Sequence, residues 1–349
     1  MPAYSPETTF ANEADRYACR EAIKTGSRTF YAASRVLPAA VREPAYGLYA
    51  FCRLSDDAID LGGGSLAALD RLRERLERVY AGAPMDHFAD RAFADFVWRF
   101  HVPRGAPEAL LEGLAWDAEG RRYETIDDLH DYAARVAGTV GAMMTLMMGE
   151  RGRVTLSRAC DLGVAMQLTN IARDVGEDAR AGRVYLPLRW LRESGIDPEA
   201  FLARPRPSEA LKDVVARLLG HADELYARAR SGVADLPWNC RPAILAAARL
   251  YAEIGREIER ADHDSIRRRA RVSGARKLAL LAGAVVASPW LEVADPAPPP
   301  LAAVRFLVDA VVAAPIPVRA RPVRERLEPQ VGRVLEMFMR LERAEQFGK

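Results

Sequence analysis

The chain has 349 residues, half of them hydrophobic, and its 50 basic and 48 acidic side chains leave a formal net charge of +2. This balance gives no overall field to attract nucleic acid, so we expect no nucleic-acid partner. The four cysteines are far apart in the sequence, which argues against a zinc site or a disulfide framework and fits a reducing cytoplasmic compartment.

The sequence predicts an all-α protein. Strong helix formers dominate, apolar residues recur every three or four positions, and the breaks contain glycine and proline. We expect one bundle of about ten helices over residues 12–290, a proline-rich linker at 295–300 and a last amphipathic helix over 323–347. No apolar run reaches the length of about 18 residues that a membrane span needs, although peripheral membrane contact stays open.

The first chemically informative element is the run Asp56-Asp57-Ala-Ile-Asp60. On a helix, Asp56 and Asp60 share a face, and two such carboxylates repel unless a cation lies between them. Arg53 precedes Asp56 by three residues and lies on the same face, where it could contact a phosphate. A solvated helix end explains an isolated acidic run about as well.

Next along the chain, residues 136–148 are apolar around the whole helix, which predicts a central position in the bundle. The first half of this segment is small, with Ala137, Gly138, Gly141 and Ala142. Small side chains could leave a channel for a greasy substrate. Tight packing between helices is the simpler interpretation of this segment taken alone.

A second polar stripe follows, in which Gln167, Asn170, Asp174 and Asp178 fall on one helical face after an apolar stretch. Such a row of oxygen atoms beside a buried segment is costly without partners. Metal ions and a phosphorylated ligand would satisfy it, and Arg173 lies beside it. Two such stripes in one helical chain make a merely solvated polar face a poor explanation.

Several segments together resemble the squalene and phytoene synthase family, and bacterial members of its phytoene branch in particular. They are Gly26-Ser-Arg-Thr-Phe-Tyr31, Leu48 to Asp60, Tyr132 with Val136 to Gly141, Gln167 to Pro187, and Asp262 to Arg269. The resemblance covers roughly residues 15–285. It implies a single-domain helical bundle of the isoprenoid-synthase type with a central cavity. Residues 12–290 would form the catalytic prenyl-diphosphate synthase domain, and residues 291–349 a linker and terminal helix of unknown role.

The resemblance also implies roles for matching residues. Asp56, Asp60, Asn170, Asp174 and Asp178 match ligands of Mg²⁺, with Mn²⁺ as an alternative, and Arg53 joins the aspartates as a catalytic residue. The positions that match residues near diphosphate, the reacting carbons or the cavity wall are Ser27, Arg28, Phe30, Tyr49, Tyr132, Gln167, Asn170 and Arg173.

The reaction implied is the head-to-head joining of two geranylgeranyl diphosphates, through a cyclopropyl diphosphate, to phytoene, without NADPH. Contact with the inner face of a membrane for product release, and with the next carotenoid enzyme, would accompany it. A squalene, presqualene or dehydrosqualene synthase acting on farnesyl diphosphate is the nearest alternative. From other classes, a non-catalytic assembly protein would be expected to lose the aspartates, and a head-to-tail prenyltransferase or terpene cyclase to carry a different second motif.

Overall fold

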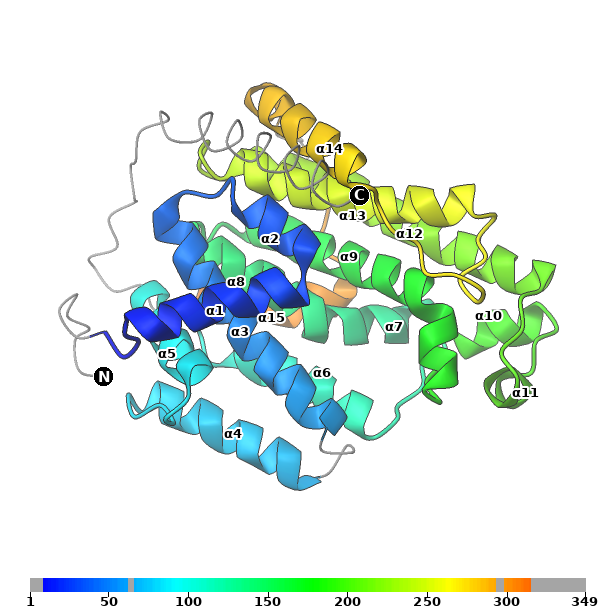
Figure 1. Ribbon diagram of the computed structural model, residues 1–349, viewed down its shortest axis with the longest axis horizontal. Helices are drawn as coiled ribbons and strands as arrows, with labels where there is room; N and C mark the ends of the chain where they lie inside the picture. Colours follow the sequence, from blue (N-terminus) through cyan, green and yellow to red (C-terminus); the bar gives the residue numbers. More distant parts are fainter. Residues whose placement is uncertain (1–8, 62–65, 293–297, 315–349) are drawn as a thin grey trace, which may run out of the picture.

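The computed structural model describes residues 9–61, 66–292 and 298–314, without the side chains of residues 28, 60, 61 and 66. Within these ranges the chain forms helices and no strand (Figure 1). The all-α prediction is therefore confirmed. The helix predicted over residues 323–347 lies outside the described residues.

Fourteen α-helices occur in the described chain up to residue 290, more than the ten expected. The extra ones are short, because local caps divide what the apolar spacing presents as continuous: the Ser27 hydroxyl, for example, accepts from the backbone N–H of Phe30 and begins a new helix there. Those before residue 150 are α1 (Glu13–Gly26), α2 (Arg28–Ser34), α3 (Ala39–Leu61), α4 (Leu66–Tyr80), α5 (Phe88–Phe100), α6 (Gly105–Ala118), α7 (Ile126–Ala133), the π-helix η1 (Ala134–Gly138) and α8 (Thr139–Met147). Those after it are α9 (Arg153–Arg180), α10 (Leu188–Glu193), α11 (Pro198–Ala203), α12 (Glu209–Val233), α13 (Arg241–Arg260), α14 (Gly274–Ala287), the 3₁₀ turns η2 (Ser288–Trp290) and η3 (Ala302–Val304), and α15 (Arg305–Ala313).

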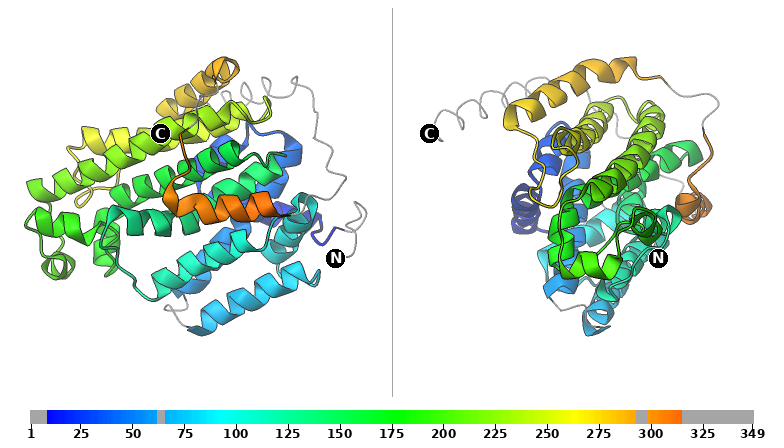
Figure 2. Two further views of the ribbon diagram at one scale, coloured as in Figure 1. Left: turned by 180° about the vertical axis from the view of Figure 1, so that it is seen from behind. Right: turned by 90° about the vertical axis from the view of Figure 1, so that its right-hand side faces the viewer.

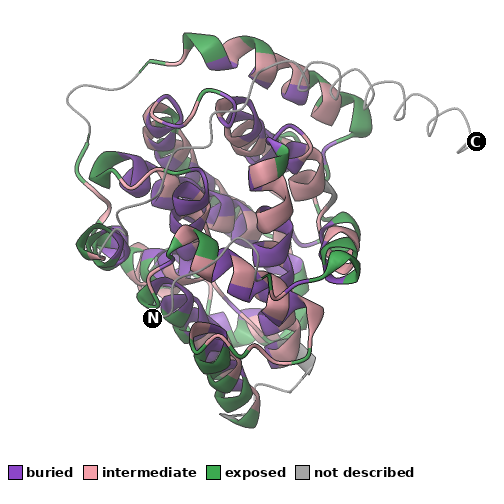
Figure 3. Cartoon of the chain, turned by 90° about the vertical axis from the view of Figure 1, so that its left-hand side faces the viewer, coloured by how far each residue is buried: buried purple, intermediate pink, exposed green. Residues whose placement is uncertain are grey.

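Helix α9 runs through the middle of the bundle, with α12 along one side and η1 and α8 along the other (Figure 1). Its 28 residues carry buried side chains around much of its circumference, including Leu156, Val164 and Leu168. The apolar segment 136–148 forms η1 and α8 and is largely buried, as predicted. In Figure 3 the buried residues gather along these inner helices, while exposed residues mark the outer faces of α4 and α14.

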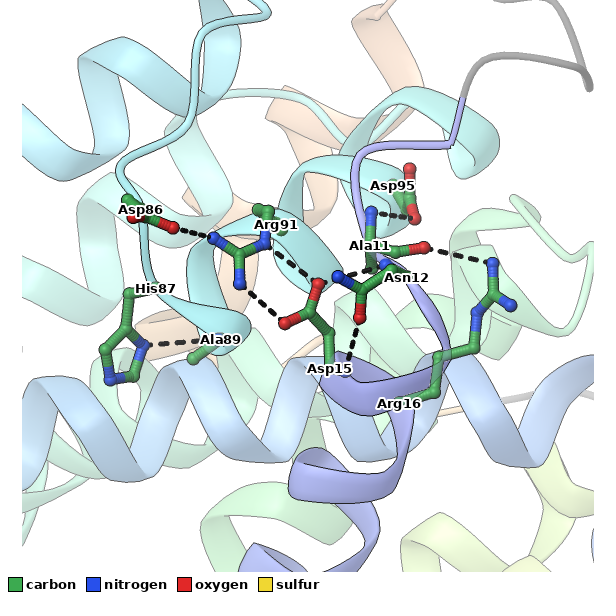
Figure 4. Close-up of polar contacts among 9 residues, drawn as sticks. All are labelled: Ala11, Asn12, Asp15, Arg16, Asp86, His87, Ala89, Arg91 and Asp95. Atoms are coloured by element: carbon green, nitrogen blue, oxygen red, sulfur yellow. Dashed lines mark hydrogen bonds and ion pairs between the residues drawn. The ribbon is translucent and has the colours of Figure 1, made fainter.

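The start of the described chain is fixed by buried charge. Asn12 and Asp15 form a capping box at the start of α1, and Arg91 of α5 donates to both carboxylate oxygens of Asp15 at 2.6 and 2.8 Å (Figure 4). Asp95 accepts the backbone N–H groups of Phe10 and Ala11 at 2.8 and 3.1 Å. These bonds hold α1 against α5 and so support α2 and α3, which carry predicted site residues.

Candidate active site

A cavity of about 310 Å³ lies between the inner helices. Its wall is mostly apolar and comes from α1, α2, α3, η1, α8, α9, α12 and α13. Phe30, Tyr49, Gln167 and Asn170, four of the residues that the sequence assigns to substrate binding, line it, and that role stays a prediction. The two amides and the tyrosine lie on the parts of α9 and α3 that lead to the aspartates, so one end of the cavity is polar.

Glycines on the cavity wall do more than leave space. A Cβ atom on Gly163 of α9 would lie 2.4 Å from the carbonyl oxygen of Ala137, and one on Gly141 of α8 would lie 2.3 Å from that of Ala159. Ala137 and Gly141 also line the cavity. The small residues of this segment therefore do two things. They allow the helices to pack closely, and they leave the cavity open for a substrate.

Asp56 lies on α3, two turns beyond Tyr49. Arg53 reaches it at 3.6 Å and pairs more closely with Asp57, at 2.7 Å. These side chains are about half exposed, so the ion pairs are weak and can exchange for a phosphate ligand. Asp60 continues the helix, and its side chain lies outside the described residues, as does that of Arg28.

On α9, Asp174 binds two guanidinium groups. Arg173 donates to it at 2.5 and 2.7 Å, and Arg269, which follows α13, donates at 2.7 and 3.0 Å. Burial acts to raise the pKa of Asp174, but the hydrogen bonds from Arg173 and Arg269 outweigh it, and the pKa falls below its ordinary value. The result is a charged carboxylate flanked by two cations suited to phosphate oxygens.

Asp178, one turn further along α9, has a pKa that is shifted in the opposite direction, above its ordinary value. Burial, and then the negative charge of Asp174, raise its pKa to about 7, and Arg183 offsets only part of this effect. A carboxylate held so close to other negative charge binds either a proton or a cation.

The donor set fits a hard divalent cation. Among the side chains that the structure describes, no group of three or more His, Cys, Asp or Glu residues lies close enough to hold a metal by itself. Mg²⁺ in proteins is commonly held by one or two carboxylates together with substrate phosphates, so the sparse donors on α3 and α9 suit it.

A half-buried carboxylate that the sequence did not reveal lies close to both acidic helices. Asp117 of α6 accepts hydrogen bonds from the hydroxyls of Tyr132 and Tyr185, each at 2.8 Å. Burial raises the pKa of Asp117 to about 6, although both hydroxyls act to lower it. The negative charge of Asp56 also raises it, which places Asp117 within electrostatic reach of the first acidic run.

Tyr132 therefore differs from its prediction as a residue of the cavity wall. It is 4% exposed and is not among the residues that line the cavity; its hydroxyl binds Asp117, and its ring lies 5.4 Å from that of Tyr185. At the cavity wall, Phe30 packs against Tyr251, with ring centroids 5.1 Å apart. Nothing in the spacing of Asp117, Tyr185, Tyr251 or Arg269 marks them, because each reaches the site by a contact distant in sequence.

A helical bundle with an apolar cavity and acidic helix faces at one end defines an isoprenoid-synthase-type protein. The family model for squalene/phytoene synthase matches residues 23–276. Phytoene synthase of Rhodobacter capsulatus is 56% identical over 279 residues, covering 79% of this chain and 82% of the relative. Phytoene synthase of Cereibacter sphaeroides is 50% identical over 331 residues, covering 90% and 91%.

Among solved structures, a dehydrosqualene synthase is similar with a TM-score of 0.72 and 31% identity, covering 78% of this chain and 95% of that one. The squalene synthase HpnC of Alicyclobacillus acidocaldarius follows with a TM-score of 0.64 and 25% identity, covering 72% and 95%. The chain belongs to the squalene/phytoene synthase family, and the resemblance found in its sequence is confirmed.

Proposed function

We propose that the protein is a phytoene synthase, which joins two molecules of geranylgeranyl diphosphate head to head through a cyclopropyl diphosphate intermediate. The observation that carries the proposal is the identity of 56% and 50% to two bacterial phytoene synthases over most of both chains. The site agrees with it, because an apolar cavity ends at acidic helix faces flanked by arginines. Carotenoid synthesis would begin at this step.

We assign Mg²⁺ binding to Asp56, Asp60, Asn170, Asp174 and Asp178. Mg²⁺, when bound, supplies charge that stabilises the departing diphosphate, and Mn²⁺ accepts the same oxygen donors. The raised pKa of Asp178, about 7, supports this assignment, since burial beside Asp174 leaves that carboxylate in need of a counterion. Chelation should abolish product formation, and either ion should restore it.

Arginines orient the diphosphates. Arg53, Arg173 and Arg269 each already hold a carboxylate, and their guanidinium groups offer the paired N–H donors that phosphate oxygens accept. Ser27 and Arg28, at the start of α2, are assigned to the same diphosphate end by the family resemblance. Gln167 and Asn170 lie where the polar end meets the apolar wall, and there they position the substrate carbon that loses diphosphate.

The cavity wall protects and stabilises the carbocation that forms when diphosphate leaves. Its apolar side chains exclude water, which would otherwise capture the allylic cation. The ring faces of Phe30 and Tyr49, both in the wall, can stabilise positive charge that develops nearby. Loss of a proton from the rearranged cation gives phytoene with no change of oxidation state, so no NADPH is expected. The likeness to dehydrosqualene and squalene synthases keeps farnesyl diphosphate as the alternative substrate.

A product assay tests this proposal. The purified protein is incubated with Mg²⁺ and either geranylgeranyl or farnesyl diphosphate, with and without NADPH, and lipids are identified by mass spectrometry. A C40 hydrocarbon formed without NADPH supports phytoene synthesis, a C30 product points to the farnesyl alternative, and no product from either substrate favours a non-catalytic role. Asp56→Ala and Asp174→Ala should each abolish turnover with unchanged helical circular dichroism, and full activity in either would contradict the metal assignment.

We also propose that the enzyme works in the cytoplasm at a membrane surface. No helix in the described ranges is both long and apolar enough to cross a bilayer. The outer face of α14, however, is an exposed apolar stripe of Ala275, Ala279 and Val286, continued by Trp290, which is 81% exposed. Exposed Arg268 and Arg271 precede it, which suits an anionic lipid surface.

Sedimentation with vesicles tests the membrane proposal. The protein should bind vesicles rich in phosphatidylglycerol more than vesicles of phosphatidylcholine, and Trp290→Ala should weaken that binding. Trp238→Ala, which removes a tryptophan that is 43% exposed elsewhere on the molecule, is the matched control. Equal effects of the two variants would contradict the assignment to α14. Contact with the next carotenoid enzyme stays a prediction.

A further inference from the structure

Residues 298–314 pack against the helical bundle, although the match to the family model ends at residue 276. This segment, which we call the strap, contains η3 and α15. It crosses the face of the bundle that is turned toward the viewer in the left-hand view of Figure 2, where it is drawn in orange. There it contacts α6, α8, α9 and η1. Its inward side chains are at most 8% exposed: Ala303, Val304, Leu307, Val308 and Val311.

A buried charge cluster fixes the start of the strap. Arg158 of α9, only 1% exposed, donates from Nη2 to the carbonyl oxygens of Pro298 and Pro299 at 3.0 and 3.2 Å. Arg228 of α12 donates to the same Pro299 oxygen at 2.7 Å. Both guanidinium groups share the fully buried carboxylate of Asp161, at 3.3 and 3.1 Å. Two cations around one anion leave excess positive charge, which the strap carbonyls help to solvate.

The same cluster belongs to the wall of the reaction cavity. Arg158 lines the cavity, and so does Gly232, whose missing side chain leaves room for it, because a Cβ there would lie 2.2 Å from the Cβ of Arg158. Arg158 precedes Asp174 by sixteen residues on one helix, about 24 Å at a rise of 1.5 Å per residue. Arg158 therefore marks the deep end of the cavity, opposite the diphosphate end.

The strap also supports the wall from outside. Leu307 of α15 lies 3.7 Å from the position that a Cβ would take on Gly138 of η1. Val136 and Ala137, in the same π-helical turn, line the cavity. Arg135 lies over the ring of Phe306 at 5.0 Å and over that of Trp116 at 4.3 Å, which ties the strap to α6. Loosening the strap would therefore loosen both α9 and η1 at the deep end.

We infer that the strap seals the deep end of the reaction cavity against water and that Arg158 is the residue that positions it. The inference rests on the proposed head-to-head reaction, which passes through carbocations. Among the described residues, Nε and Nη1 of Arg158 and Oδ1 of Asp161 form no hydrogen bond, although Nε lies 3.3 Å from Oδ2 of Asp161. Such buried groups draw in water once a path opens.

Water at the deep end would change the product. Ionisation breaks the C–O bond of geranylgeranyl diphosphate, and the electron pair leaves with diphosphate. A water oxygen then bonds to the allylic cation and releases a proton, which gives a C20 alcohol in place of the C40 hydrocarbon. The oxygen of that alcohol comes from solvent, whereas simple phosphatase cleavage at phosphorus keeps the substrate oxygen.

The experiment uses full-length Arg158→Met protein with Mg²⁺ and geranylgeranyl diphosphate in water enriched in ¹⁸O. We expect the ratio of ¹⁸O-labelled C20 alcohol to C40 hydrocarbon to rise roughly tenfold over wild type, because the cavity no longer excludes water. Arg75→Met is the matched control: it removes the partner of Asp90, a fully buried carboxylate between α4 and α5, and neither residue lines the cavity. It should lower stability and leave the ratio unchanged.

If Arg158→Met fails to fold, Leu307→Ala provides the same test, because it thins the contact on η1 without stranding a charge. Wild-type ratios in both Leu307→Ala and a folded Arg158→Met would overturn the seal, as would an equal rise in Arg75→Met. If wild type forms no C40 hydrocarbon, the proposed function is wrong and the inference fails with it. If wild type forms it and only the strap variants leak alcohol, both proposals stand.

Discussion

The close approach of α9 to η1 at Gly163 yields a quantitative prediction. A Cβ at this position would lie 2.4 Å from the carbonyl oxygen of Ala137, whereas ordinary contacts of this kind are about 3.5 Å. In Gly163→Ala the two helices must therefore separate by about 1 Å. Overpacking of this kind costs about 1–3 kcal/mol, and the better helix propensity of alanine returns about 0.5–1 kcal/mol. We expect a net loss of about 0.5–2 kcal/mol in the free energy of unfolding.

Gly220→Ala is the matched control for this prediction. Gly220 lies within α12, and nothing approaches a Cβ there within 4 Å. The same chemical change should then stabilise the protein by about 0.5–1 kcal/mol through helix propensity alone. Urea unfolding followed by far-ultraviolet circular dichroism measures both variants. If Gly163→Ala unfolds at the same or a higher urea concentration than wild type, the close packing of α9 and η1 does not limit stability, and the argument is wrong.

Two further predictions concern polar groups that are buried or half-buried. Burial lowers the pKa of His130 from an ordinary 6.5 to about 4. Between pH 6.5 and pH 4 the imidazole is therefore protonated in the unfolded chain but neutral in the folded protein. The free energy of unfolding falls as the pH drops through that window. His130→Phe should recover about 3 kcal/mol of that fall, which unfolding curves at pH 7 and pH 4 will measure; parallel losses in both proteins would refute it. Tyr185→Phe removes a hydroxyl that donates to Asp117 at 2.8 Å, and it should cost about 1.5–3 kcal/mol at pH 8. Adding Asp117→Asn should then cost less than it does in wild type, and strict additivity in this double-mutant cycle would show that the bond contributes little.

Local spacing allowed much of the site to be predicted from sequence. Gln167, Asn170, Asp174 and Asp178 share one face of α9 because a helix repeats every 3.6 residues, and the structure also places the first two in the cavity wall. The burial of residues 136–148 followed in the same way from an apolar surface around the whole segment. These inferences need only the geometry of a single helix.

The remaining site residues come together through tertiary contacts that have no period in the sequence. Arg269 reaches Asp174 across 95 positions, and Tyr185 reaches Asp117 across 68. Each is one charged or aromatic residue among many. Arg269 is brought to Asp174 by the packing of the segment after α13 against α9, and Tyr185 to Asp117 by the packing of the segment after α9 near α6. The sequence analysis did not predict helix α15 for a related reason. Its nine residues are too few for a clear apolar repeat, and their position depends on contacts with α6, α8 and α9.

The distribution of charge along α9 connects these observations. Near one end Asp174 is held between Arg173 and Arg269, where half-exposed and partly buried ion pairs can exchange for the phosphates of a substrate. At the other end Arg158 is only 1% exposed and donates to backbone carbonyls of the strap. Between them Leu162 and Met166 offer only apolar surface to the cavity. Ionisation is therefore favoured at one end of the helix, and the cation formed there faces a mostly apolar wall that excludes water as long as the far end stays closed.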